Sequence, residues 1–139
     1  MAGNITFTII KPVAFRKNYT GLILARITQA GFRICALKTV QLTIEQAKKF
    51  YEVHADRPFY NDLVEFMSSG PVAVGILEKE NAVEDYRRLI GATNPAEAED
   101  GTLRFLFGTS LRANAVHGSD SDENAERECD FFFARSERY

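Results

Sequence analysis

The sequence predicts one domain in which short β-strands alternate with α-helices. Its 139 residues are the length of a single domain that buries roughly two-thirds of its unfolded surface, so we take residues 1–139 as one domain. Apolar residues recur with a period of two over residues 5–10 and at helical spacing in several later stretches. The resulting order is strand, helix, strand, two helices, strand, helix, long irregular segment, short strand and helix. This order fits both a split β-α-β plait and a doubly wound parallel sheet.

Composition narrows the class of protein. The chain is 45% hydrophobic with a net charge of −2, so it lacks the overall basic bias of most nucleic-acid-binding proteins. No apolar run approaches the ~20 residues of a membrane span, and Met1-Ala2-Gly3-Asn4 has no signal-peptide features. Cys35 and Cys129 lie in apolar patterns typical of buried free thiols. We expect a soluble cytoplasmic protein with no membrane segment and no specific nucleic-acid partner.

The first element is a strand over residues 5–10, in which large apolar side chains alternate with threonine. It ends at Lys11-Pro12, because proline cannot donate to the hydrogen-bond ladder of a sheet. Lys11 is therefore either a solvated strand end or a charge directed into a site. A helix is predicted next over residues 20–30, capped by Thr20 and ended by Gly31, and a strand over residues 32–42.

A capping box of Thr43 and Gln46 predicts the start of the following helix. Its apolar stripe includes Tyr51 and ends at His54, which is either a structural, half-exposed histidine or part of a site. Pro58 suits the first position of another helix, whose apolar stripe begins with Phe59 and continues through Leu63, Phe66 and Met67.

Residues 72–77 are continuously apolar, which predicts a strand buried on both faces. Asn81 and Glu84 then start a helix whose inner side includes Tyr86. Arg87 falls on the same side, where it either extends outward to water or faces a phosphate.

The periodicity is lost from Gly91 to Ala113, and a long irregular segment in a compact domain is usually functional. The chain has no glycine-rich phosphate loop and no paired-carboxylate metal cage. Scattered side chains must therefore hold any phosphate, and arginine suits that task because its planar fork donates twice. The available residues are Lys11, Arg87, Thr93 and Arg104, with Asn114 for a sugar hydroxyl.

The most specific stretch is Asn114-Ala115-Val116-His117-Gly118-Ser119-Asp120-Ser121. The glycine leaves His117 open to a bulky charged substrate, and the Ser-Asp-Ser run predicts a helix start. In that helix Glu128 lies on the same side as the apolar Cys129 and Phe132. It is either solvated at the edge of this face or sheltered and paired with His117 or Ser119, because an unpaired buried charge is costly. Since it falls on the face of Cys129 and Phe132, we expect it to be sheltered and partnered.

Asn-x-x-His-Gly-Ser-Asp-Ser, with a glutamate eleven residues after the histidine, resembles the signature of nucleoside diphosphate kinases. The similarity runs from Thr8 to about Phe133. It implies an α+β fold, the ferredoxin-like plait, with a four-stranded antiparallel sheet and helices packed on one face. It also implies a ping-pong reaction in which the γ-phosphate of a nucleoside triphosphate passes to a nucleoside diphosphate through a phosphohistidine. The alternative is a catalytically silent nucleotide-binding or interaction module on the same fold.

The resemblance also assigns roles to residues. His117 is the nucleophile, phosphorylated on its pros nitrogen, and Glu128, Ser119 and Lys11 assist it. The residues implied for nucleotide binding are Lys11, His54, Phe59, Leu63, Arg87, Thr93, Arg104, Leu111 and Asn114. Phe59 and Leu111 would cover the two faces of any base, and Mg2+ would ride mainly on the phosphates, with Asp120 nearest through water. Partners would be ATP and other nucleoside tri- and diphosphates, and the chain would form a homo-oligomer, a hexamer or a tetramer.

Overall fold

The computed structural model describes residues 3–139, so the part of the signal-peptide expectation that concerns Met1 and Ala2 lies outside the described residues. The strands form one four-stranded sheet in the order β2-β3-β1-β4, and every neighbouring pair is antiparallel. The strands are β1 (Ile5–Ile10), β2 (Arg33–Val40), β3 (Val72–Glu78) and β4 (Val116–Gly118). The antiparallel plait is therefore confirmed, and the doubly wound parallel sheet is excluded.

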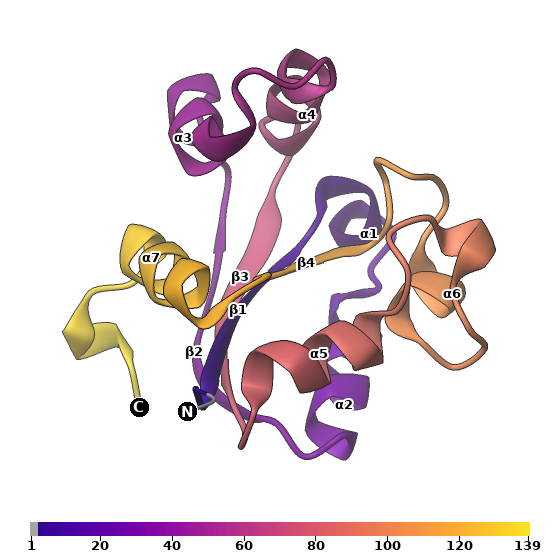
Figure 1. Cartoon of the computed structure of the whole chain (residues 1–139), viewed down its shortest axis with the longest axis vertical. Coiled ribbons are helices and arrows are strands. Elements are labelled where there is room, and N and C mark those ends of the chain that lie inside the picture. The colour runs from indigo at the N-terminus through magenta and orange to yellow at the C-terminus, as the bar shows by residue number, and fades with distance from the viewer. Residues whose placement is uncertain (1–2) are drawn as a thin grey trace.

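Helices flank the sheet on both sides, as Figure 1 shows. The α-helices are α1 (Pro12–Arg16), α2 (Thr20–Gln29), α3 (Ile44–Phe50), α4 (Tyr60–Met67), α5 (Ala82–Ile90), α6 (Leu103–Phe107) and α7 (Asp122–Phe132). Short 3-10 turns cover Glu52–His54, Pro95–Glu97 and Arg135–Glu137. None of the helices between residues 3 and 139 combines the length and apolarity that crossing a membrane requires.

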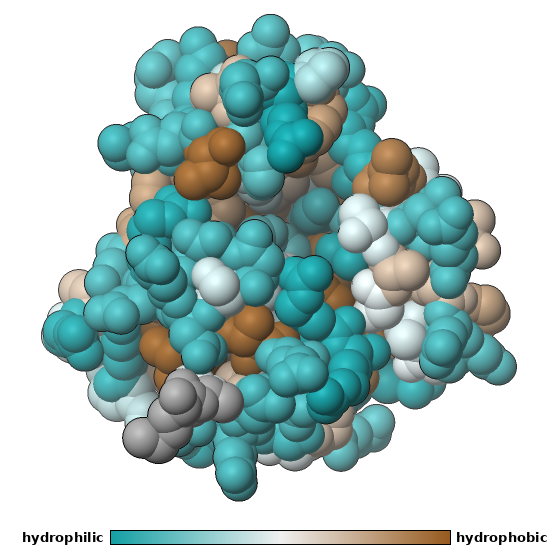
Figure 2. Space-filling view, viewed as in Figure 1, coloured by the Kyte–Doolittle hydropathy of each residue, from teal (hydrophilic) through white to brown (hydrophobic). Residues whose placement is uncertain are grey.

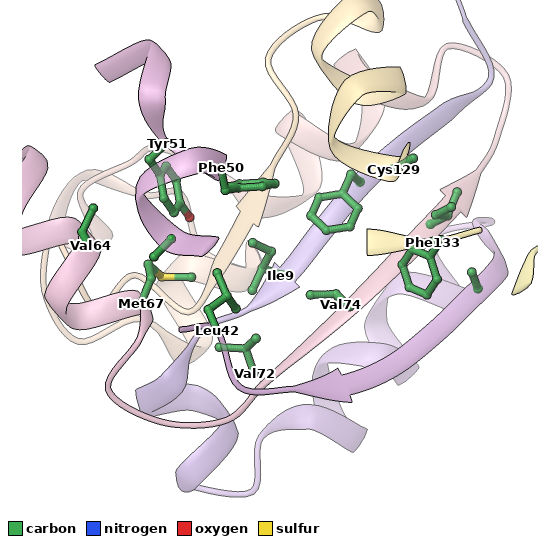
Figure 3. Packing of buried hydrophobic residues seen from close by; sticks show 14 of the residues in the cluster. Ile9, Leu42, Phe50, Tyr51, Val64, Met67, Val72, Val74, Cys129 and Phe133 are labelled. Carbon is green, nitrogen blue, oxygen red and sulfur yellow. The ribbon is translucent and has the colours of Figure 1, made fainter. Parts of the chain in front are cut away.

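The expectation that helices cover one face of the sheet was wrong, because both faces carry a hydrophobic core. Phe7 and Ile9 of β1 pack into a core with α3, α4 and α7 (Figure 3). Ile10 of the same strand and Leu77 of β3 pack into a second core with α2 and α5. Successive strand residues point to opposite faces, so the continuous apolar run of β3, predicted to be buried on both sides, requires two cores.

Local signals placed several element ends correctly. The capping box of Thr43 and Gln46 is present in both directions, and the hydroxyl of Ser121 caps α7 by accepting from the backbone N–H of Asn124. Gly31 follows α2 with a φ of 95°, a conformation that favours glycine.

Other boundaries differ from the prediction. Tyr19, not Thr20, occupies the position before α2. The helix expected to reach His54 ends at Phe50, and His54 lies in the 3-10 turn that follows. Pro58 belongs to a turn, and α4 begins at Tyr60, because the fixed φ of proline suits a turn as well as a first helical turn.

Two short helices were missed. Pro12, which ends β1, is also the first residue of α1, in keeping with the preference of proline for that position. Within the segment predicted to be irregular, Thr102 caps α6 by accepting from the backbone N–H of Phe105. Each helix has five residues, which is too short for a helical repeat to be recognised.

Candidate active site

His117 lies in the middle of β4, an edge strand, and its ring is tied to α7. Its Nε2 is 2.8 Å from Oε1 of Glu128. The Ser119 hydroxyl donates to the same oxygen at 2.8 Å and accepts from the backbone N–H of Phe7 at 3.2 Å. Glu128 is 5% exposed and Ser119 fully buried, so the prediction of a sheltered, partnered Glu128 is confirmed.

These contacts determine where the protons lie. Because the Ser119 hydroxyl accepts from a backbone N–H, its own proton points to Glu128. A carboxylate accepts only, so in the neutral ring the hydrogen bond to Glu128 places the proton on Nε2 of His117. Nδ1, the pros nitrogen, then carries the free lone pair.

Aromatic rings surround the imidazole. Phe7, Phe50 and Tyr51 present their rings edge-on to His117, with centroids 5.6–6.2 Å away. The Tyr51 hydroxyl is buried without a hydrogen-bond partner among residues 3–139. Burial, with the charge of Glu128, raises the pKa of Tyr51. An unpaired buried hydroxyl is costly, so this group is available to a ligand.

The second oxygen of Glu128 faces Arg127. Nη2 of Arg127 is 3.6 Å from Oε2 of Glu128, and its guanidinium carbon is 5.8 Å from the centre of the Phe50 ring. This cation lies on the same cavity wall as His117. The carboxylate is therefore held on both oxygens, by His117 and Ser119 on one side and by a cation on the other.

Lys11 is buried and directed inward, which settles the two alternatives left by its place at the end of a strand. Its Nζ donates to Oδ1 of Asn114 at 2.8 Å, and Nδ2 of Asn114 donates to the carbonyl of Thr93 at 3.0 Å. Burial, reinforced by the charge of Arg104, lowers the pKa of Lys11 from 10.5 to about 7. No carboxylate bonds to Lys11 among residues 3–139, so an anion would restore its charge.

The cleft consists of adjoining cavities, and Figure 2 shows the surface hollowed between the α3–α4 hairpin and the parts that carry α7 and α6. A cavity of about 260 Å3 contains most of the predicted site. Its predicted members are Lys11, His54, Phe59, Leu63, Arg87, Thr93, His117, Asp120 and Glu128. A second cavity of about 460 Å3 shares Lys11, Phe59, Leu63 and Thr93 with it and adds Leu111 and Asn114.

Phe59 and Leu111 come from two different segments that line this second cavity, the turn before α4 and the loop before β4. Phe59 is 49% and Leu111 61% exposed, although Phe59 was predicted to belong to a buried stripe. Val64 and Met67 fill the core instead. The difference arises because α4 begins one residue after Phe59, which leaves that ring at the mouth of the cleft, 5.7 Å from His54.

Arg104 lies beside this cleft and not in it. Its guanidinium donates to the carbonyls of Gly91 and Val116, both at 3.0 Å, and burial lowers its pKa. It lines a neighbouring cavity of about 590 Å3 that also contains Arg87 and Thr93. Arg87 is exposed and lines both the cavity of Arg104 and the cavity of His117, so the two cavities meet at this side chain.

Asp120 is the other carboxylate in the cavity of His117. Its Oδ1 accepts from Nδ2 of Asn124 at 2.6 Å. That hydrogen bond, helped by the charge of Arg87, lowers the pKa of Asp120 below its ordinary value. Between residues 3 and 139 no group of three or more His, Cys, Asp or Glu side chains could hold a metal ion. One ionised carboxylate in this place fits a cation that arrives with its phosphates.

Comparisons with known proteins point to one family. The family model described as "Nucleoside diphosphate kinase" matches residues 4–138. A nucleoside diphosphate kinase of Flavobacterium psychrophilum is 58% identical over 139 residues and covers all of both chains. One from Campylobacter fetus is 59% identical over 132 residues, 95% of this chain and 96% of its own.

This chain belongs to the nucleoside diphosphate kinase family. The resemblance, the fold and the prediction of a phosphotransferase are thereby confirmed. The crystal structure of the Aquifex aeolicus nucleoside diphosphate kinase superposes with a TM-score of 0.96 at 45% identity, covering 98% of this chain and 99% of that one. That of Halobacterium salinarum, in complex with CDP, gives 0.93 at 34% identity, over 99% and 92%.

Membership of a nucleotide-binding kinase family implies a divalent cation. Family membership does not by itself identify the two residues of the cavity that the sequence analysis missed, Tyr51 and Arg127. Tyr51 was counted only as part of an apolar stripe, although its hydroxyl was a signal that a stripe residue can also face a site. Arg127 gave no signal, because its contact with Glu128 depends on how the side chains turn at the mouth of the cleft.

Proposed function

We propose that this nucleoside diphosphate kinase transfers the γ-phosphate of ATP or another nucleoside triphosphate to a nucleoside diphosphate through a phosphohistidine on His117. The observation that supports this most directly is the hydrogen bond that leaves Nδ1 of His117 as the free nitrogen of a half-buried ring. In the first half-reaction Nδ1 bonds to the γ-phosphorus, and the bond from that phosphorus to the bridging oxygen breaks. The diphosphate leaves with that electron pair, and a second diphosphate reverses the step.

Glu128 holds the ring and stabilises the positive charge that it gains during attack, and Ser119 fixes Glu128. The Ser119 hydroxyl is locked between the backbone of Phe7 and the carboxylate, so neither group has to reorganise in the transition state. Preorganised charge of this kind lowers a barrier more than charge that must be rearranged.

Cations that line the same cavity as His117 would receive the phosphates. Lys11 and Arg87 line the cavity of His117 and would neutralise the transferred group, with Thr93 as a further contact. Arg104 would act from the neighbouring cavity, which shares Arg87 and Thr93. Tyr51, whose hydroxyl lacks a partner among residues 3–139, lines the same cavity and would add a donor there.

Mg2+, the cation that we propose, would be held mainly by the phosphate oxygens, with Asp120 as its nearest protein group through water. When bound, it supplies positive charge that neutralises the phosphate chain. The ionised state of Asp120, favoured by its hydrogen bond from Asn124, suits that task.

The nucleoside would occupy the second cavity, with the base between Phe59 and Leu111 over Leu63. Asn114, already bonded to Lys11 and Thr93, would meet a ribose hydroxyl, and His54 would lie near the phosphates. An aromatic face and an aliphatic side chain accept every base, so we expect broad use of nucleotides.

The extent of the domain, the location of the protein and its assembly are also part of this proposal. The chain acts as one domain of residues 1–139 in the cytoplasm, where its nucleotide substrates are found. It assembles as a homo-oligomer, a hexamer in preference to a tetramer. Light scattering at micromolar concentration tests the assembly, and particles of only the 15.6 kDa chain mass would contradict it.

Incubation with γ-labelled ATP and Mg2+ tests the reaction. We expect an acid-labile, base-stable phosphoprotein whose label passes to added nucleoside diphosphate. A protein that binds ATP yet never becomes labelled would instead be the catalytically silent module.

A further inference from the structure

Two charged side chains at the base end of the cleft have no ion-pair partner among residues 3–139. Asp62 of α4 and Arg112 of the loop before β4 line the same cavity as Phe59 and Leu111. Among residues 3–139 neither forms an ion pair within 4.0 Å. An acid and a base that share a cavity and do not bond to each other leave room for a polar group between them.

Helical geometry places Asp62 on the side of α4 that faces the cleft. It is three residues after Phe59, and residues three or four apart lie on one face of a helix; Leu63 follows it directly in the chain. Both neighbours line the cleft. The carboxylate therefore lies on the face that would carry the base and not on the side of α4 that packs into the core.

Arg112 is held from the opposite side. It directly follows Leu111, and its guanidinium carbon lies 5.4 Å from the centre of the Phe66 ring on α4. Arg112 and Asp62 also share a smaller cavity with Glu65 and Phe66. That cavity contains neither Lys11 nor Thr93, so the pair marks the end of the cleft away from the proposed phosphate site.

We propose that Asp62 and Arg112 recognise the edge of a guanine base and give this enzyme a preference for guanine within its broad use of nucleotides. Guanine has two adjacent donors, N1–H and the N2 amino group, which a carboxylate accepts together. It also has two adjacent acceptors, O6 and N7, which a guanidinium fork matches. Adenine, cytosine and thymine all lack the pair of donors, and adenine and thymine also lack a pair of adjacent acceptors.

The preference should be modest. Both side chains are exposed, so water competes for their hydrogen bonds, and the net gain is about three- to tenfold in rate constant for a hydrogen bond of this kind. The inference rests on the proposed placement of the base between Phe59 and Leu111.

The experiment isolates the second half-reaction. Phosphoenzyme is prepared with ATP, freed of nucleotide and mixed rapidly with GDP, IDP or ADP, and the second-order rate constant of dephosphorylation is measured. IDP keeps N1–H, O6 and N7 and lacks only the N2 amino group. We expect GDP to react about three- to tenfold faster than IDP.

Substitution of Asp62 and substitution of Arg112 should alter the rates of different diphosphates. Asp62→Ala should slow GDP more than IDP, so that the two react at equal rates in this variant, and should change ADP little. Arg112→Met should slow GDP and IDP by a similar factor, because both carry O6 and N7. Glu65→Gln is the matched control, since Glu65 lies on α4 beside the smaller cavity and does not line the base cavity. Its ratio of GDP to IDP should equal that of the wild type.

Equal rates for GDP and IDP in the wild type would overturn the proposal, and so would a ratio that Asp62→Ala leaves intact. Phe59→Ala separates this failure from failure of the proposed site. If Phe59→Ala slows all three diphosphates while GDP and IDP react equally, the base binds in the slot and its edge is not recognised. If Phe59→Ala changes nothing, the slot itself is wrong.

Discussion

The two ends of the cleft differ in how complete they are before a nucleotide binds. At the phosphate end, Glu128 and Ser119 are buried and the hydrogen bond that holds the His117 ring is already made. At the base end, Phe59 and Leu111 are about half exposed and line an open cavity.

The difference follows from what each end must do. Charge develops on the imidazole during attack, and stabilising it is effective only if the carboxylate is already in place. A base needs only a surface on which to stack, and exposed side chains can adjust to bases of different size. We therefore expect changes at the phosphate end to alter the rate of transfer and changes at the base end to alter affinity, which the following predictions test from the largest effect to the smallest.

His117→Ala should abolish both the phosphoenzyme and the transfer of phosphate, because no other described side chain presents a nitrogen in this position. Circular dichroism and nucleotide binding should remain near those of the wild type, since His117 lies on the short edge strand β4. Transfer near the wild-type rate, with the label on another residue, would overturn the mechanism.

Glu128→Gln should slow single-turnover phosphorylation of His117 by about tenfold or more. The amide keeps the shape and can still hydrogen-bond, but the charge that favours a positive ring is gone. Nucleotide affinity should change little, because Glu128 supports the nucleophile and not the ligand. Glu126→Gln, on the exposed side of α7, is the matched control. An unchanged rate in Glu128→Gln would leave the carboxylate a structural role only.

Nucleotide affinity should fall as the pH rises above about 7, the pKa of Lys11 in the free protein. Bound phosphate favours the charged lysine, so above this pH binding must take up a proton, and affinity drops by up to about tenfold per pH unit until the pKa of the complex is reached. Below pH 7 Lys11 is already charged and contributes no pH dependence.

Calorimetry in buffers of different ionisation enthalpy measures this uptake directly, between pH 7.5 and 9, where the nucleotide phosphates no longer titrate. Lys11→Met should abolish the proton uptake, and Lys17→Met, which removes an exposed lysine nearby in sequence, should leave it unchanged. Binding by the wild type without proton uptake would show that Lys11 is charged before the nucleotide arrives.

Phe59→Ala should weaken all nucleotides to a similar degree, by about 1 kcal/mol, the low end of the range for base stacking because the ring is half exposed. ATP, GTP, CTP and dTTP should remain within about tenfold of one another as donors. Phe105→Ala, which removes an equally exposed ring outside the cleft, should leave affinity unchanged. A loss confined to purines would contradict stacking as the common contact.

The sequence by itself determined the features that depend on neighbouring residues. The period of two in β1, the capping box of Thr43, the cap of Ser121 and the glycine after α2 are all local, and the structure has each of them. The face shared by Glu128 and Cys129 also predicted burial correctly, because both lie within one helix. The proposed nucleophile, His117, likewise comes from a short local motif.

Only the tertiary structure decided the features that join distant segments. The order of the strands and the use of both faces of the sheet depend on which helix packs where, which a pattern within one element does not contain. The pKa of a buried side chain also depends on segments that are distant in the sequence. Lys11 and Asn114 are 103 residues apart, and the lowered pKa of Lys11 comes from burial and from Arg104. Whether an arginine such as Arg104 or Arg127 faces water, a carbonyl or a carboxylate is settled by the surroundings that folding creates, because its long side chain can reach any of them.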